Sequence, residues 1–122
     1  MPDPGSNYLP DAGRAWIPEA KLRAYALNPD HQDGGHKARV FEADLALRQR
    51  DWAYLRDAIL RALPDTPVHE VRERGDGAKS YTVIVEITGL NGRTGRVTTG
   101  WYVASGKSPR LATVYIDKRH RR

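Results

Sequence analysis

Two segments of alternating apolar residues, joined by an Asn-Gly turn, constrain the fold of this 122-residue chain more than any other feature. In KSYTVIVEI the apolar side chains recur at every second position, which is the period of a half-buried strand. They are Tyr81, Val83, Val85 and Ile87. RVTTGWYV has the same spacing, and the Asn91-Gly92 dipeptide between the two segments is typical of a hairpin turn. The pattern predicts a long antiparallel hairpin.

Helical patterns precede this hairpin, and further strand patterns flank it. One helix is predicted from Pro18 to Asn28, a second after Asp33 as its N-cap, and a third from Asp51 to Pro64. Strands are predicted at 68–74 and 110–116. We therefore expect an α+β fold in which two to three N-terminal helices pack on a four-stranded, mainly antiparallel sheet.

Length and composition narrow the class of protein. The length fits one domain, which we expect at residues 17–116, between an irregular arm (1–16) and a basic tail (117–122). The chain has no cysteine, which excludes disulfides, thiolate metal sites and a cysteine nucleophile. It shows neither a membrane-length apolar run nor a secretory signal. We expect a cytoplasmic protein that does not bind membranes, unless it is released from a larger delivered protein.

Positive charge gathers near the C-terminus. Residues 96–122 hold seven basic residues and one acidic residue, although the chain as a whole carries a net charge of +5. Such a region suggests a polyanionic partner. It is equally compatible with a solvated tail made of Lys118, Arg119, Arg121 and Arg122.

The first candidate site straddles the start of the second predicted helix. Its polar residues are Asp30, His31, Asp33, His36 and Lys37. Unpaired N–H groups at a helix start suit a phosphate, and Gly34 and Gly35 would let the backbone approach it. A neutral imidazole at His36 beside the charge of Lys37 fits cleavage of RNA through the ribose 2′-hydroxyl. The alternative is that these residues form an ordinary polar loop without a functional role.

The same segment has a metal-binding interpretation. Two histidines and two aspartates lie within seven residues, a set that suits a divalent ion. They are Asp30, His31, Asp33 and His36. Because His31 falls in a loop, we rank this metal-dependent nuclease below metal-free chemistry.

The second candidate site lies on the late strands. Thr99 and Trp101 share one strand face, where a threonine can hold a phosphate and a tryptophan can stack on a base. The spacing alone favours a core position for Trp101. The neighbouring residues Arg96, Arg110 and Thr113 form either a basic groove or ordinary solvent-exposed positions.

Four blocks of this sequence, in order, resemble a bacterial family of short, uncharacterised proteins. The same domain occurs at the ends of larger toxin-like proteins. The family's H-x-x-G-x-x-K-A-x-x-F signature falls here on His31, Gly34, Lys37, Ala38 and Phe41. The other blocks are DWAYLRDAIL, then GLNGRTGRVTTGWYV with its Thr-x-Trp, and finally SPRLATVYI.

The layout of this family is similar to that of the ribonuclease superfamily that groups barnase, EndoU, the tRNA-cleaving colicins and RelE. The resemblance to colicin D is the nearest, with a Lys/His cluster early and a Ser-x-Trp late in the domain. His36-Lys37 and Thr99-x-Trp101 match these places, with threonine for serine. The Gly100 between them stands where the family often carries a larger residue, which predicts a looser strand.

The resemblance implies a metal-independent endoribonuclease toxin that needs no cofactor and acts on RNA, with tRNA as a candidate substrate. It implies that His36 and His31 form the acid/base pair, that Lys37 stabilises the transition state, and that Thr99 and Trp101 hold phosphate and base. It also implies a small acidic antitoxin or immunity protein as partner. A non-catalytic module that binds nucleic acid or a protein partner remains the alternative. The ribonuclease interpretation requires the His36-Lys37 helix start to face Thr99 and Trp101 across one open groove.

Overall fold

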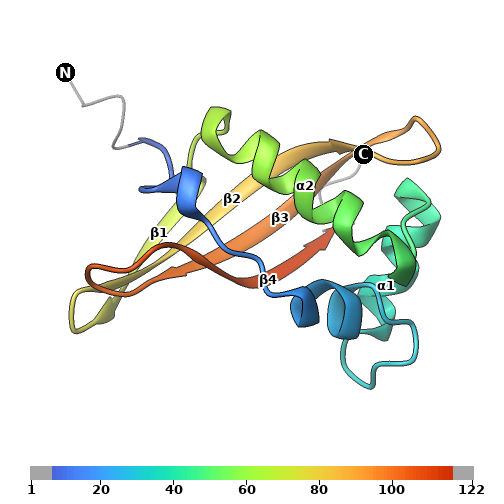
Figure 1. The fold of residues 1–122 in the computed structure, drawn as a ribbon, viewed down its shortest axis with the longest axis horizontal. Helices are drawn as coiled ribbons and strands as arrows, with labels where there is room; N and C mark the ends of the chain where they lie inside the picture. Colours follow the sequence, from blue (N-terminus) through green and yellow to red (C-terminus); the bar gives the residue numbers. More distant parts are fainter. Residues whose placement is uncertain (1–6, 117–122) are drawn as a thin grey trace.

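The predicted hairpin forms the middle of a four-stranded sheet in the computed structural model, which describes residues 7–116 (Figure 1). Successive strands pair antiparallel in the order β1-β2-β3-β4. Their bounds are β1 Glu70–Gly75, β2 Ala78–Thr88, β3 Thr94–Val103 and β4 Arg110–Ile116. The predicted α+β class with an antiparallel sheet is confirmed. β1 and β4 are the edge strands.

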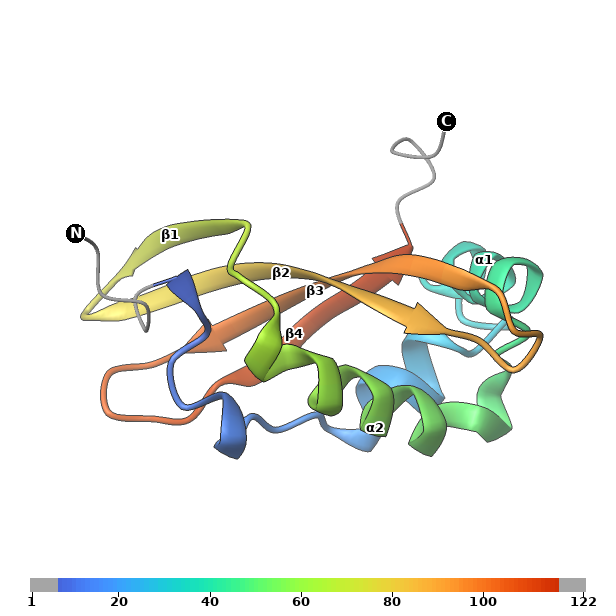
Figure 2. The same cartoon turned by 90° about the horizontal axis from the view of Figure 1, so that it is seen from above.

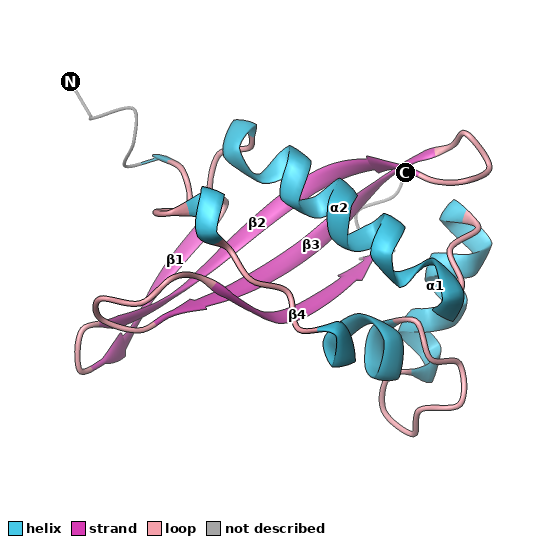
Figure 3. Cartoon of the chain, viewed as in Figure 1, coloured by secondary structure: helices cyan, strands magenta, loops and turns pink. Residues whose placement is uncertain are grey.

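Helices cover one face of this sheet. Figure 2 shows α2 and the N-terminal segment below the sheet, with α1 at the end where β4 finishes. Figure 3 separates the helices from the strands by colour. The two α-helices are α1 Gly35–Leu45 and α2 Trp52–Ala62. The short helical segments are η2 Ala12–Arg14, η3 Lys21–Ala26, η4 Gln49–Asp51 and η5 Leu63–Asp65.

The predicted helix ends agree with the structure better than the predicted caps do. η3 ends before Asn28, and α2 gives way to η5 at Leu63, just before Pro64. Asp51 does precede α2, but its carboxylate accepts the N–H of Arg48 at 2.9 Å and does not cap the helix. Asp33 is not the N-cap of α1, because Gly34 occupies that position. Backbone pattern therefore predicted the elements, whereas the cap contacts depended on neighbouring segments.

The core lies between the helices and the inner face of the hairpin. Phe41 of α1, Leu55 of α2 and Leu22 of η3 are fully buried in one hydrophobic cluster with Val85 and Val97 of the sheet. Burying a side chain of this size contributes about 1.5–3 kcal/mol. Alternate residues of β2 and β3 supply this face, so the period of two in the sequence corresponds to the buried side of the sheet.

The described part of the N-terminal arm, residues 7–16, packs on the domain. Leu9 is 3% exposed and belongs to the core, and the Asn7 carbonyl accepts the N–H of Val68 at 2.6 Å. Trp16 forms a parallel bridge with Arg110 of β4. The predicted basic tail at 117–122 lies outside the described residues. Within 7–116, no helix is both long and apolar enough to cross a bilayer.

Candidate functional site

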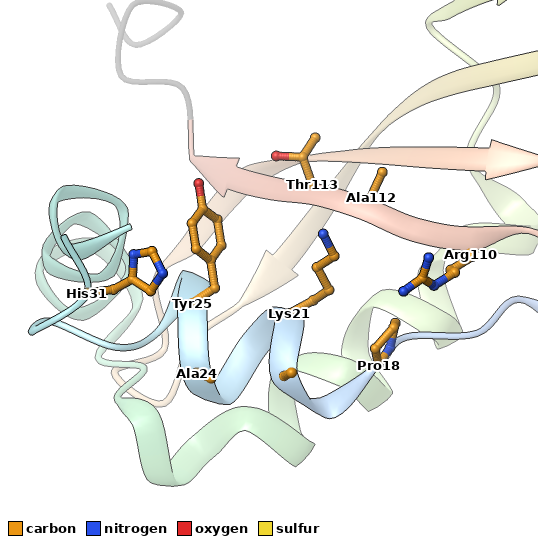
Figure 4. A pocket seen from close by; sticks show the side chains of 9 residues that line it. Pro18, Lys21, Ala24, Tyr25, His31, Arg110, Ala112 and Thr113 are labelled. Carbon is orange, nitrogen blue, oxygen red and sulfur yellow. The ribbon is translucent and has the colours of Figure 1, made fainter. Parts of the chain in front are cut away.

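A groove of about 410 Å³ lies between η3 and the edge strand β4 (Figure 4). His31, in the loop before α1, lies at one end of the groove, and Arg110 lies at the other end. The lining residues are Pro18, Ala20, Lys21, Ala24, Tyr25, His31, Arg110, Ala112 and Thr113. The groove thus brings together segments that are about ninety residues apart in the sequence.

Tyr25 and Lys37 form a polar pair at the α1 end of the groove. The Lys37 ammonium donates to Tyr25 Oη at 3.1 Å, lies 4.9 Å from the centre of that ring and lies 5.4 Å from the Tyr115 ring. Contacts of this kind with aromatic faces stabilise a half-buried ammonium. Because Tyr25 Oη accepts this bond, its own hydroxyl proton remains available for a ligand.

His31 packs edge-on against Tyr25, with ring centres 4.7 Å apart and an interplanar angle of 83°. Its Nδ1 accepts the N–H of Asp33 at 3.0 Å and the N–H of Gly34 at 2.9 Å. A neutral imidazole that accepts at Nδ1 carries its proton on Nε2. His31 therefore presents a donor at Nε2, while its Nδ1 holds the loop that leads into α1.

The role that we predicted for Gly34 and Gly35, access of a phosphate to the start of α1, is not supported by the structure. The N–H of Gly35, the first residue of α1, is already used, since it donates to the His31 carbonyl at 2.9 Å, and the N–H groups of Asp33 and Gly34 before it donate to His31 Nδ1. The two glycines serve close packing within the protein. A Cβ on Gly34 would lie 2.7 Å from the Tyr25 carbonyl oxygen, and one on Gly35 would lie 2.6 Å from that of Pro29. Contacts below about 3 Å are not tolerated, so the glycines let this loop approach η3.

The β4 wall of the groove is shaped by a bulge. Trp101 pairs with Leu111 and Gly100 pairs with Thr113, so Ala112 is an extra residue in β4. A Cβ on Gly100 would lie 2.7 Å from Thr113 Cγ2. The space beside Gly100 is therefore filled by Thr113, which itself lines the groove, and the looser strand that we expected there stays a prediction.

The groove is positively charged. Lys21 and Arg110 line it, and Lys37 reaches it through Tyr25. None of its lining residues is acidic, and no described carboxylate forms an ion pair with these three cations. Uncompensated positive charge in a hollow with low-dielectric walls attracts anions.

The family model for a domain of unknown function, DUF6883, matches residues 8–118. The chain belongs to the DUF6883 family. The match includes every residue that lines the groove. No curated protein and no solved structure matches the chain. The likeness to colicin D and its superfamily stays a prediction.

The prediction that Thr99 and Trp101 of this DUF6883 domain hold substrate is wrong for the folded structure. Their side chains are 0% and 1% exposed. Trp101 Nε1 donates to Thr99 Oγ1 at 2.8 Å, and Thr99 Oγ1 donates to the Val83 carbonyl at 2.6 Å. Both polar groups are thereby paired inside the core, so neither can contact a phosphate or a base.

Two further predicted residues lie away from the groove of the DUF6883 domain. His36 is exposed, and neighbouring residues on a helix point about 100° apart, so its side chain diverges from that of Lys37. Arg96 pairs with Glu86 across β2 and β3 and lines a separate hollow near η5. The expectation of His36 in the acid/base pair and of Arg96 in the binding groove is therefore not supported.

The metal-binding alternative lacks its ligand set. Among residues 7–116, no three side chains of histidine, aspartate or glutamate gather as a metal ion requires. Asp30 and Asp33 are exposed in the loop, and His31 Nδ1 is occupied by backbone N–H groups. The four residues are close in sequence but do not converge in space.

The DUF6883 groove combines four predicted residues with two that sequence reasoning missed. His31, Lys37, Arg110 and Thr113 were candidates and lie in or beside it. Lys21 and Tyr25 were treated only as part of a helix. The signal that points to them is their spacing of four, which places a lysine and a tyrosine on one side of η3.

Proposed function

We propose that this protein is a metal-independent endoribonuclease that binds an RNA phosphate in the groove between η3 and β4. One observation carries the proposal: two groups of the groove present hydrogen-bond donors beside three cations, and none of the described residues that line the groove is acidic. These groups are the Tyr25 hydroxyl and His31 Nε2. Donors and positive charge are what a phosphodiester requires, and they also stabilise the extra charge of its transition state.

The proposed reaction begins when the ribose 2′-oxygen attacks phosphorus and its proton passes to water. The bond from phosphorus to the 5′-oxygen breaks, leaving a 2′,3′-cyclic phosphate on one fragment. Tyr25 donates its hydroxyl proton to the departing 5′-oxygen and regains a proton from solvent. The Lys37 ammonium, 3.1 Å from Tyr25 Oη, stabilises the transient phenolate. His31 Nε2 donates to a phosphate oxygen.

A second candidate function is RNA binding without cleavage. The observation that favours it is the double hydrogen bond to His31 Nδ1, which holds the imidazole in the form that has no lone pair at Nε2. His31 therefore does not act as a general base in this conformation. In this alternative the groove holds the RNA backbone, and the bond to phosphorus stays intact.

Cleavage of purified cellular RNA in EDTA distinguishes these functions, and the chain offers two matched pairs of variants. His31→Asn keeps a side-chain acceptor for the N–H groups of Asp33 and Gly34 and removes the imidazole, with exposed His36→Asn as its control. Lys37→Met removes one of the three positive charges at the groove, with Lys107→Met in the β3–β4 loop as its control. We expect His31→Asn and Lys37→Met to lose about a hundredfold in cleavage rate, and the controls to retain it.

The outcomes are separable. Cleavage in EDTA that ends in cyclic phosphates and depends on Lys37 supports the nuclease. Salt-dependent RNA binding that depends on Lys37, without any cleavage product, supports the binding module. Equal activity in all four variants would remove the groove from either function.

The proposal extends to toxicity and to a protein partner. A ribonuclease with an open site slows the growth of the cell that makes it, and a net charge of +5 favours an acidic inhibitor. The test is expression of the wild type and of Lys37→Met in the same host. Growth inhibition by the wild type alone is the expected result, and equal growth of the two strains contradicts the toxin assignment.

A further inference from the structure

Trp16 is a large apolar side chain that the fold holds in solvent. It is 57% exposed, although an indole of this size normally buries most of its surface. Its backbone is fixed on both sides, because Trp16 N donates to the Pro109 carbonyl at 2.8 Å and the Trp16 carbonyl accepts the N–H of Leu111 at 2.9 Å. The ring is thus exposed on a rigid support.

Arg110 connects Trp16 to the groove. Its guanidinium carbon lies 5.4 Å from the centre of the Trp16 ring, and its side chain also lines the groove, at the end opposite His31. A guanidinium at this distance from an indole is attracted to the ring, and its N–H groups stay free to bind a phosphate. The tryptophan therefore extends the groove beyond Arg110.

We infer that Trp16 is a base-stacking subsite for single-stranded RNA, next to the phosphate held near Arg110. The inference rests on the proposed phosphate groove. An exposed aromatic face beside a cation accepts a base of any sequence, because every base has a flat π-face. The charge of the groove favours a nucleic acid over an apolar peptide as its occupant, and a base within a duplex has no free face to offer.

Fluorescence offers a direct test, because the chain has three tryptophans in different environments. Trp101 is 1% exposed, and Trp52 is half-buried beside Arg56. In a Trp52→Phe protein, only Trp16 can stack on an added base. The probe is a short 2′-O-methyl RNA, which resists cleavage through the 2′-oxygen, compared with an abasic strand of the same length.

We expect the RNA to quench Trp16 emission and the abasic strand to leave it unchanged. Trp16→Ala is expected to weaken RNA binding about tenfold, Trp16→Phe less, and Trp52→Phe not at all. Affinity for the abasic strand should be the same in wild type and Trp16→Ala. Circular dichroism of the variants checks that they are folded.

Two failures are distinguishable. If the wild type and Trp16→Ala bind the RNA equally well while Lys37→Met binds it weakly, the stacking subsite is overturned and the phosphate groove stands. If the wild type binds neither strand, both the groove and the subsite are overturned.

Discussion

Two pairs that join an aromatic ring to a polar group have opposite fates in this molecule. Trp101 and Thr99 lie in the core, where indole, hydroxyl and the Val83 carbonyl form a closed chain of hydrogen bonds. Tyr25 and Lys37 lie beside the groove, where the ammonium bonds the phenol and the phenolic proton remains unused. Only the second pair can still bond a ligand.

The two pairs differ in whether the last hydroxyl proton of the hydrogen-bond chain has a partner within the protein. A buried polar group must be paired within the protein, because leaving it unpaired costs about 1–3 kcal/mol. The Thr99 hydroxyl ends on a backbone carbonyl, so it contributes stability and has nothing left for a substrate. The Tyr25 hydroxyl lies beside the groove, so its proton is available to bind a ligand. The first pair should therefore affect folding, and the second should affect function.

The largest expected loss of stability comes from Trp101→Ala in the buried pair. Removing a fully buried indole leaves a cavity and takes away the N–H that donates to the Thr99 hydroxyl, so the free energy of unfolding should fall by about 3–5 kcal/mol. Urea denaturation measures it. The control is Trp16→Ala at an exposed position, with an expected change within about 0.5 kcal/mol. Equal losses in the two variants would contradict the assignment of Trp101 to the core.

A smaller effect is expected from Thr99→Val, which keeps the side-chain shape and removes the hydroxyl. Trp101 Nε1 then has no acceptor, so the free energy of unfolding should fall by about 1–3 kcal/mol. RNA binding per folded molecule, measured by titration well below the denaturation midpoint, should not change. Weaker RNA binding in a stably folded Thr99→Val protein would restore a substrate role to Thr99. The control is Thr94→Val at an exposed position of β3.

The smallest effect on stability is expected from Tyr25→Phe. The half-buried Lys37 ammonium loses one hydrogen bond and keeps its contact with the ring, so the free energy of unfolding should fall by less than about 1 kcal/mol. RNA binding should weaken about tenfold, because a donor to the phosphate is lost. Titration with RNA and thermal melting measure the two effects. A large loss of stability with unchanged binding would reverse the contrast between the pairs.

The strands and helices follow from local pattern, but the caps do not. The alternation in KSYTVIVEI and RVTTGWYV and the Asn91-Gly92 turn predicted β2, β3 and their pairing, because a period of two is a property of the backbone itself. The start of α1 was predicted with Asp33 as its cap, but Gly34 occupies the N-cap position, and His31 Nδ1 accepts N–H groups of the preceding loop instead. A cap depends on which side chain the loop turns inward, and several residues of the loop have suitable acceptors.

The residues of the candidate site could likewise be predicted only in part. His31, Lys37, Arg110 and Thr113 were identified because histidine, lysine and arginine near a loop or an edge strand suggest anion chemistry. His36 and Lys37 adjoin in sequence, yet the helical rotation separates them. Tyr25 drew no functional prediction, because a tyrosine on an apolar helical face has the pattern of a core residue.

The sequence by itself determined the order of elements, the inner face of the hairpin and the excess of positive charge, since these depend on spacing and composition. Tertiary structure decided which polar side chains remain available. Trp101 and Thr99 were withdrawn into the core, whereas Tyr25, from a segment far away in the chain, was placed beside β4. The physical reason is that hydrogen-bond capacity is consumed by whichever partners packing supplies, and those partners come from distant parts of the chain.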